Sequence, residues 1–382
     1  MGPRPGRRSR RDTAVIVVAK IGSSSVTDTG GRVDGTAVTK LCAEVADVRA
    51  AGHQVVVVSS GAIAAGRPAL GIRDVRRSEA RATDLATLQA ISAVGQSRLM
   101  RVYDDLLATH GLVGGQVLLA PLDFVHRQQY LHARQTLTRL LELGVVPVVN
   151  ENDAIADDEI RFGDNDRLAA LTAHLVRADV LVLLTDAPGL LTADPRLDSE
   201  ASLIQEVVEV DRELERMAGG AGSERGSGGM ASKLAAAKIA VWSGIRVVIA
   251  AADRPAVLAD AVTGRPGVGT VVRARDRRLP ARKLWIAFAV DAAGTIMVDE
   301  GARRALTERG TSLLPAGVVA VKGSFEADDA VEVTTAAGEV FAKGLARMPS
   351  RRLTEWRGRR TDELPDDLPH EVVHRDDLVL LA

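Results

Sequence analysis

Two lysines in glycine-rich surroundings are the first candidates for chemistry in this sequence. Only seven of its 49 basic residues are lysines, and a chain that relies so strongly on arginine is expected to keep lysine where a compact point charge matters. Lys20 follows an apolar run and precedes Gly22, and Lys233 follows Gly228-Gly229-Met230. Ammonium groups beside closely approaching backbone amides suit phosphate oxygens. We therefore expect both lysines to bind an anionic substrate.

A second glycine-rich turn contains a serine. The segment Ser59–Gly66 follows another apolar run, and its backbone amides also suit phosphate or carboxylate oxygens. Tight turns from strand to helix need glycine in any case, so one such loop alone leaves the functional and the structural interpretation open. Ser60 lacks the leading glycine of a Gly-x-Ser-x-Gly nucleophile motif. We interpret Ser60 as a binding residue rather than a nucleophile.

Two short segments combine amide and carboxylate side chains, Asn150-Glu151-Asn152-Asp153 and Gly163-Asp164-Asn165-Asp166. Such a mixture of donors and acceptors suits a substrate that carries both an ammonium group and carboxylates. Taken alone, each segment also fits turn and capping residues, and Asp164 is placed to cap the helix that follows it. Because both segments and both glycine turns are expected at one sheet edge, we favour the functional interpretation.

The common nucleotide-binding motifs do not account for these residues. A Walker A phosphate loop is absent, because Lys233 lies between Ser232 and Leu234. The stretch Gly226–Ala231 matches a dinucleotide fingerprint by letter, yet it follows a polar loop rather than a strand. We expect instead a flexible loop whose amides fold over nucleotide phosphates. A helix over residues 231–242 then projects Lys233 from its first turn.

The composition is that of a globular protein without a dominant charge. The 382 residues are 46% hydrophobic and 26% charged, with a net charge of -1, which excludes a wholly disordered chain and gives no general attraction to polyanions. No apolar run approaches the roughly 20 residues of a membrane helix, so no membrane association is expected. The single Cys42 excludes an intrachain disulfide and indicates a reducing compartment, by default the cytoplasm. The histidines lack metal-binding spacings, so we expect no metal site on protein side chains.

Short apolar runs alternate with longer amphipathic stretches over most of the chain, as in strand–helix–strand units on a mostly parallel sheet. Helices are expected over 38–48 and 131–141, each ended by a glycine. The expected strands are residues 15–19, 55–59, 113–118, 145–149, 180–185 and 246–250. In such α/β folds ligands bind beyond the carboxyl ends of the strands, where the candidate residues fall.

The sequence texture changes after Arg273, where a charged segment containing Pro280 interrupts this pattern. We expect a small β-rich domain beyond it, with strands over 295–298, 317–321, 330–333 and 340–341. The expected organisation is a disordered arginine-rich leader at 1–12, the large domain at 13–272, a helix-poor linker at 273–284 and the small domain at 285–379.

Together these motifs resemble the amino acid kinase family and, within it, the glutamate 5-kinases that carry a C-terminal PUA domain. The resemblance runs from Thr13 to about Leu378 and implies a three-layer α/β sandwich around a mostly parallel sheet, plus a small β-rich PUA-like domain. The matching segments of the large domain are Lys20–Ser23, Val58–Gly66, Ala93–Leu99, Asn150–Asp153, Gly163–Asp166, Leu183–Asp186, Thr192–Arg196 and Gly228–Lys233. Those of the tail are Val298–Ala302, Ser312–Pro315 and His374–Asp377. Departures from the family pattern are the leader, Ser227 where threonine is frequent, and residues 361–369.

The resemblance implies that ATP, with Mg2+ on the nucleotide, phosphorylates the side-chain carboxylate of L-glutamate to L-glutamyl 5-phosphate in the first step of proline biosynthesis. It implies Lys20, Lys233 and Asp166 as catalytic residues, with Asp166 orienting the two lysines. The implied glutamate-binding residues are Ser60, Asp153, Asn165, Asn150 and Asp164. The implied ATP-binding residues are Lys20, Gly22, Thr185, Asp186, Ser227, Gly228, Gly229, Met230, Ala231, Ser232 and Lys233.

The resemblance also implies a homo-oligomer (dimer or tetramer), proline as a feedback inhibitor, and the next enzyme of the proline pathway as a partner. Two alternatives stay open: a kinase of the same fold for aspartate or acetylglutamate, and an RNA-binding protein, because of the PUA-like tail. From Trp285 to Ala382 the chain has 17 acidic and 12 basic residues. That balance disfavours binding to a phosphate backbone, so we expect no RNA partner.

Overall fold

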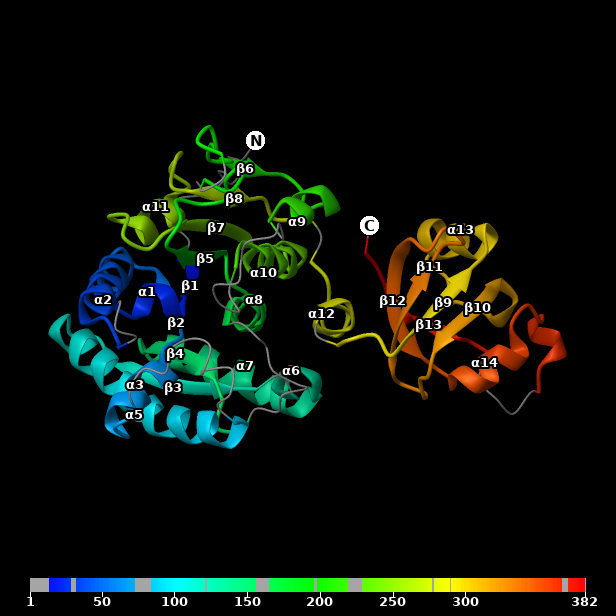
Figure 1. Cartoon of the computed structure of the whole chain (residues 1–382), viewed down its shortest axis with the longest axis horizontal. Helices are drawn as coiled ribbons and strands as arrows, with labels where there is room; N and C mark the ends of the chain where they lie inside the picture. Colours follow the sequence, from blue (N-terminus) through cyan, green and yellow to red (C-terminus); the bar gives the residue numbers. More distant parts are fainter. Residues whose placement is uncertain are drawn as a thin grey trace, which may run out of the picture. The chain divides into compact units, whose positions relative to one another are not determined.

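The chain forms two compact units, residues 1–278 and 279–382 (Figure 1). The computed structural model describes residues 14–28, 32–72, 84–120, 122–155, 165–195, 198–218, 229–276, 278–288, 290–365 and 370–381. The expected leader, Asp164, Ser227 and Gly228 lie outside these described residues. The two units divide inside the expected linker, and residues 281–284 of that linker already belong to a helix, α12 (Ala281–Phe288).

The first unit is built on an eight-stranded sheet with the order β3-β4-β2-β1-β5-β7-β8-β6. All neighbours from β3 to β7 are parallel, and β8 runs antiparallel to β7. The strands are β1 (Ile16–Ile21), β2 (Gln54–Ser59), β3 (Gly114–Leu119), β4 (Val146–Glu151), β5 (Val180–Thr185), β6 (Glu206–Val207), β7 (Arg246–Ala251) and β8 (Thr270–Val272). The six expected strands are thus confirmed to within one residue at most ends, whereas β6 and β8 were not expected.

Helices cover both faces of this sheet (Figure 1). Helices α2, α3, α5 and α11 contact one another in one layer, and α7, α8, α10 and α9 contact one another in the other. The helices are α1 (Ser23–Val26), α2 (Gly35–Ala50), α3 (Ala62–Ala69), α5 (Leu85–Thr109), α6 (Leu122–Val125), α7 (Arg127–Glu142), α8 (Asn165–Val176), α9 (Arg212–Ala218), α10 (Met230–Trp242) and α11 (Val257–Thr263). The mostly parallel three-layer α/β architecture is therefore confirmed.

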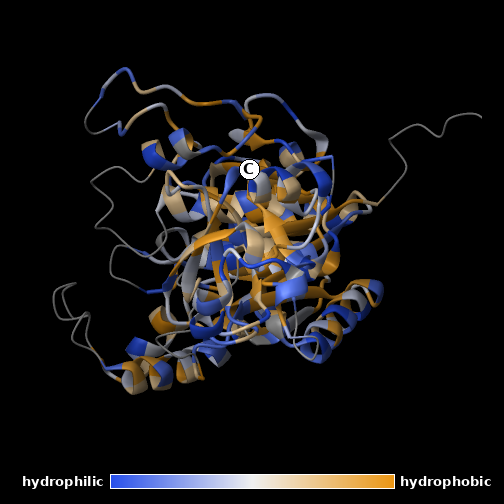
Figure 2. Ribbon diagram, turned by 90° about the vertical axis from the view of Figure 1, so that its right-hand side faces the viewer, coloured by the Kyte–Doolittle hydropathy of each residue, from blue (hydrophilic) through white to orange (hydrophobic). Residues whose placement is uncertain are grey.

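The alternation of side chains along β1 decides which layer receives its lysine. Val17, Ala19 and Ile21 belong to the apolar core shared with α2, α5 and α11. Successive strand residues point to opposite faces, so Lys20 points to the layer of α8 and α10. Figure 2 colours the whole chain by hydropathy, and strands at the centre of that view are predominantly hydrophobic. In the first unit, β1 and β5 are buried along nearly their whole length, as expected for strands that are covered on both faces.

The second unit contains a five-stranded sheet with the order β10-β9-β11-β12-β13. Its strands are β9 (Gly294–Val298), β10 (Val318–Gly323), β11 (Ala330–Thr334), β12 (Val340–Ala346) and β13 (Val373–Leu380). Its helices are α12, α13 (Glu300–Arg309), α14 (Ser350–Trp356) and the 3-10 turns η1 (Pro315–Gly317) and η2 (Thr361–Glu363). The four expected strands are present, and β13 is additional because its polar centre, His374–Asp377, hides the strand pattern.

Two glycines let α3 and α5 touch backbone to backbone. A Cβ atom on Gly95 would lie 1.7 Å from the carbonyl oxygen of Ala62, and one on Gly66 would lie 2.0 Å from that of Ile91. Helix α3 starts directly after Gly61, whose φ of 108° is a left-handed conformation that favours glycine. The contact between α3 and α5 therefore fixes the position, relative to α5, of the turn that contains Ser60.

We expect Gly95→Ala to lower the free energy of unfolding by about 1–3 kcal/mol, because the new methyl group forces the two helices apart. The matched control is Gly35→Ala in α2, where a Cβ atom would have no neighbour within 4 Å. Alanine also favours a helix over glycine, so this control should be as stable as the wild type or slightly more stable. Urea unfolding followed by circular dichroism measures both, and equal stability of the two variants would refute the packing role.

Candidate active site

The predicted site residues gather where neighbouring parallel strands end. Lys20 of β1 is level with Val58 of β2 and with Leu183 of β5, and Val58 is level with Val149 of β4. The residues that follow in each strand therefore lie along one edge of the sheet. This places Ser60, Asn150 and Thr185 at the same edge as Lys20, where open parallel sheets bind their ligands.

The three predicted catalytic residues meet at one carboxylate. Lys20 forms an ion pair with Oδ1 of Asp166, and the Nζ atom of Lys233 lies 3.1 Å from Oδ2. The hydroxyl of Ser232 donates to the same Oδ2 at 3.2 Å. The side chains of Lys20, Asp166 and Lys233 are only 2%, 0% and 6% exposed. Two ammonium groups from distant parts of the sequence are thus held at one buried point.

Burial explains why this arrangement needs the carboxylate. Removing one member of a buried ion pair typically costs about 3–5 kcal/mol, because the remaining charge is left uncompensated. Asp166 lies in the first turn of α8, where the helix dipole also stabilises a negative charge. A Cβ atom on Gly22 would lie 3.4 Å from the Lys20 ammonium. Glycine at this position therefore leaves room beside that ammonium for a ligand.

The expected nucleotide side is formed by α10 and the end of β5. Gly229 is the N-cap of α10, and residues 230–233 form its first turn, in which the N–H groups of Ser232 and Lys233 donate to the Gly229 carbonyl oxygen at 3.2 and 3.4 Å. The backbone N–H groups at the start of a helix point along its axis toward any ligand placed there. At the end of β5, the Thr185 hydroxyl donates to the carboxylate of Asp186 at 3.0 Å. A helix N-terminus with a lysine in its first turn suits phosphate oxygens.

The expected amino-acid side centres on Asn165, the neighbour of Asp166. Its Nδ2 group lies 2.7 Å from the Ser60 hydroxyl, 2.9 Å from the Ser59 carbonyl oxygen and 3.0 Å from Oδ1 of Asn150. Its Oδ1 atom is buried and has no hydrogen-bond partner among the described residues. A buried acceptor without a donor costs about 1–3 kcal/mol, so a ligand that donates a hydrogen bond here would bind favourably.

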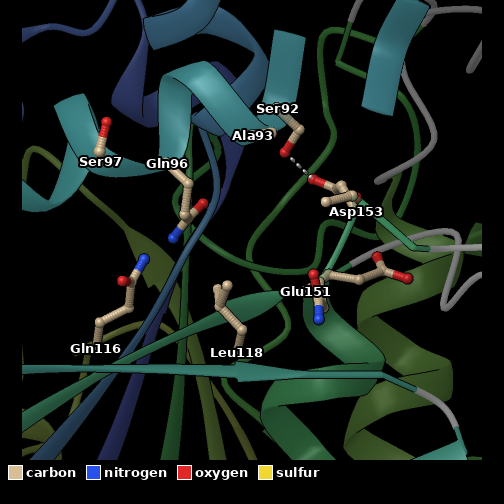
Figure 3. A pocket seen from close by; sticks show the side chains of 10 residues that line it. Ser92, Ala93, Gln96, Ser97, Gln116, Leu118, Glu151 and Asp153 are labelled. Carbon is tan, nitrogen blue, oxygen red and sulfur yellow. Dashed lines mark hydrogen bonds between the residues drawn. The ribbon is translucent and has the colours of Figure 1, made fainter. Parts of the chain in front are cut away.

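A cavity of about 300 Å3 adjoins this side between α5 and the ends of β3 and β4 (Figure 3). Asp153 and Glu151 contribute carboxylates to its wall, and Gln96 and Gln116 contribute amides. Ser92 donates a hydrogen bond to Asp153 at 3.1 Å. Among the described residues that line the cavity, none is basic. Its chemistry therefore suits a cationic group such as an ammonium.

The sequence analysis assigned no role to three polar residues of α5 that support the site, although one of them, Gln96, falls in the family-matching segment Ala93–Leu99. Ser92 and Gln96 contact Asp153 and Asn150, and the Tyr103 hydroxyl lies 2.8 Å from Oγ of Ser59. Burial raises the pKa of Tyr103, so this hydroxyl keeps its proton at neutral pH. The available signal was their helical spacing within an otherwise apolar face, at Ile91, Gly95, Leu99, Met100 and Leu107.

Comparison with known proteins follows the same division of the chain. Residues 15–251 match the model of the amino acid kinase family, and residues 294–368 match that of the PUA domain. The chain belongs to the amino acid kinase family. Glutamate 5-kinases from Pelobacter propionicus and Citrifermentans bemidjiense are 43% and 45% identical to it over 369 residues, covering 96% of this chain and 97% of each relative. The glutamate 5-kinase from Paraburkholderia phytofirmans is 44% identical with the same coverage.

The described part of this amino acid kinase contains neither a metal-binding cluster nor a membrane-spanning helix. Among the described residues, no group of three or more histidine, cysteine, aspartate or glutamate side chains is placed to hold a metal ion. None of the helices in the described part of the chain is long and apolar enough to cross a membrane.

The single cysteine of this amino acid kinase belongs to the apolar core of the first unit. Cys42 is buried in α2, and burial raises its pKa to about 12. It is therefore a protonated thiol at neutral pH and has no nucleophilic role. We expect a disulfide reagent such as dithionitrobenzoate at pH 8 to react with the native protein at least about a hundredfold more slowly than with the protein in guanidinium chloride. Fast reaction of the native protein would contradict the burial of this thiol.

Proposed function

We propose that this amino acid kinase transfers the γ-phosphoryl group of ATP to the side-chain carboxylate of L-glutamate, which gives L-glutamyl 5-phosphate and ADP in the first step of proline biosynthesis. The observation that carries the proposal is the pair of buried ammonium groups on Asp166. It occurs in a chain 43% and 45% identical to proteins named glutamate 5-kinase.

The reaction brings a carboxylate close to the negatively charged phosphates of ATP, and the two lysines offset the repulsion between them. An oxygen of the glutamate carboxylate attacks the γ-phosphorus, and the bond from this phosphorus to the oxygen shared with the β-phosphate breaks. The nucleophile is ionised at neutral pH, so no general base is needed. Catalysis then consists of positioning and of neutralising the phosphoryl oxygens. We assign the neutralisation to Lys20 and Lys233, and the placement of both to Asp166.

The proposed nucleotide site consists of Lys20, Gly22, Thr185, Asp186 and the segment 227–233. Apart from the Asp186 carboxylate, its described groups are ammonium ions, hydroxyls and the amides of α10, which suit phosphate oxygens. This donor set fits a Mg2+ ion carried by the nucleotide and water, the usual mode of binding for this ion beside phosphates. When bound, Mg2+ supplies additional charge neutralisation at the phosphate oxygens.

The proposed glutamate site consists of Ser60, Asn150, Asp153, Asp164 and Asn165. The buried Oδ1 atom of Asn165 and the Asp153 carboxylate are acceptors suited to the α-ammonium group of an amino acid. These acceptors favour glutamate over acetylglutamate, the substrate of an alternative kinase of the same fold. The nitrogen of acetylglutamate is uncharged and has only one hydrogen to donate.

Several partners belong to the same proposal. Proline shares the α-amino acid end of glutamate, so we propose feedback inhibition at or near the glutamate site. We also propose a homo-oligomer, either dimer or tetramer, and contact with the next enzyme of the proline pathway, since acyl phosphates are labile. The single cysteine favours a cytoplasmic location. The first unit is proposed as the catalytic domain and the second as a PUA-like domain without an RNA partner.

The proposed function is tested with a panel of acceptors. The purified protein is incubated with ATP, Mg2+, hydroxylamine and one of L-glutamate, L-aspartate or N-acetyl-L-glutamate. We expect hydroxamate and ADP to form in equal amounts with L-glutamate. With either of the other acceptors we expect at least about tenfold less product, because L-aspartate is one carbon shorter and N-acetyl-L-glutamate lacks the ammonium charge. A preference for aspartate or N-acetylglutamate would assign the chain to a neighbouring activity.

We expect Lys233→Met to lower kcat by about a hundredfold or more, the usual effect of losing one group that stabilises transition-state charge. Folding should persist, because Asp166 keeps its ion pair with Lys20. The matched control is Lys238→Met in the same helix, which removes a partly exposed ion pair with Glu215 instead. Steady-state kinetics and thermal unfolding of both variants test this role, which unchanged turnover of Lys233→Met would exclude.

A further inference from the structure

Helix α5 presents two polar side chains to the segment that ends β4. Ser92 and Gln96 are one helical turn apart and therefore share a face of α5. Ser92 donates to Asp153 at 3.1 Å, and Gln96 accepts a hydrogen bond from Asn150 at 3.0 Å. Both α5 residues are buried, with 3% and 8% of their surface exposed. One face of this helix thus contacts two of the proposed glutamate-binding residues.

The orientations of the Asn165 and Asn150 side-chain amides follow from neighbouring backbone groups that can only donate or only accept a hydrogen bond. The Ser59 carbonyl oxygen can only accept, so the Asn165 atom beside it at 2.9 Å is the Nδ2 donor. The backbone N–H of Glu151 can only donate, so the Asn150 atom beside it at 2.9 Å is the Oδ1 acceptor. The same Oδ1 receives Nδ2 of Asn165 at 3.0 Å. The Nδ2 group of Asn150 is thereby directed at Gln96.

Gln96 supplies the acceptor that completes this chain of hydrogen bonds. Without it, the buried Nδ2 group of Asn150 would lose its partner, because Asn150 is only 2% exposed. Reversing the Asn150 amide would bring its NH2 group against two other donors, the Glu151 N–H and Nδ2 of Asn165. At the other end of this series of hydrogen bonds, the Oδ1 atom of Asn165 is buried and has no hydrogen-bond partner among the described residues.

We propose that Gln96 is a positioning residue for the amino-acid substrate, which acts through Asn150 to hold the Asn165 amide with its Oδ1 atom available to the substrate ammonium. This role rests on the proposed function. The packing of α5 agrees with this role. Gly95, the residue before Gln96, contacts Ala62, and this contact holds α5 against α3, the helix that follows Ser60. The residue that accepts the hydrogen bond of the Asn150 amide is thus carried by an anchored helix.

The decisive variants are Gln96→Met, which keeps the length of the side chain but removes the acceptor, and Gln96→Glu, which restores an acceptor at the same place. We expect Gln96→Met to raise the KM for glutamate by at least about tenfold, with the KM for ATP within about twofold of the wild type. Gln96→Glu should recover most of the affinity for glutamate. The wild-type enzyme in the same assay establishes separately whether glutamate is the substrate.

The matched control is Thr109→Ala at the end of α5, a residue that does not line the cavity. The Thr109 hydroxyl donates to the Leu106 carbonyl of its own helix at 2.7 Å. Its KM for glutamate should equal that of the wild type. Thermal unfolding of all variants separates positioning from packing. The proposal is overturned if Gln96→Met loses stability without a change in KM, if both KM values rise equally, or if Gln96→Glu fails to improve on Gln96→Met.

Discussion

The buried carboxylate of Asp166 is the constraint on which the site depends. Two ammonium groups repel each other strongly where water is excluded, and a carboxylate between them makes their proximity possible. Because Lys20 lies on the central strand β1 and Lys233 in the first turn of α10, this single group ties the sheet to two helices of one layer. The arrangement also requires Lys20 to point to the face covered by α8, which the alternation of side chains along β1 provides.

Helix α8 joins the two halves of the site through adjacent residues. Asp166 belongs to the half that is proposed to hold phosphoryl groups, together with β1 and α10. Asn165 belongs to the other half, with the Ser60 turn and the end of β4. Since both residues lie in the first turn of one helix, the distance between the proposed acceptor and donor sites is fixed by backbone geometry rather than by flexible loops. Such fixed positioning is the main contribution that phosphoryl transfer needs from a protein.

The sequence predicted most of the sheet because strands buried on both faces are continuous apolar runs. It failed where that signal is absent: β6 has only two residues, and the centre of β13 is polar. The lysines were identifiable because lysine is rare in this chain, and Asp166 through its resemblance to the family. The polar residues of α5 that contact the site were not identifiable in this way. A polar residue such as Gln96 on an amphipathic helix usually faces solvent, so its sequence position does not indicate a buried contact. The direction of an amide depends on groups from distant segments, which spacing along the chain does not encode.

The glycines of the site show that one motif can serve separate physical needs. Gly61 permits a left-handed turn, Gly22 keeps space open beside the Lys20 ammonium, and Gly66 allows α3 to touch α5. Only the second of these concerns a ligand directly. The other two set the positions of Ser60 and of α5, and through α5 the direction of the hydrogen bonds that end at Asn165. A glycine-rich segment beside the proposed phosphate site therefore contributes through helix packing, which orients the proposed amino-acid side, as well as through its backbone amides.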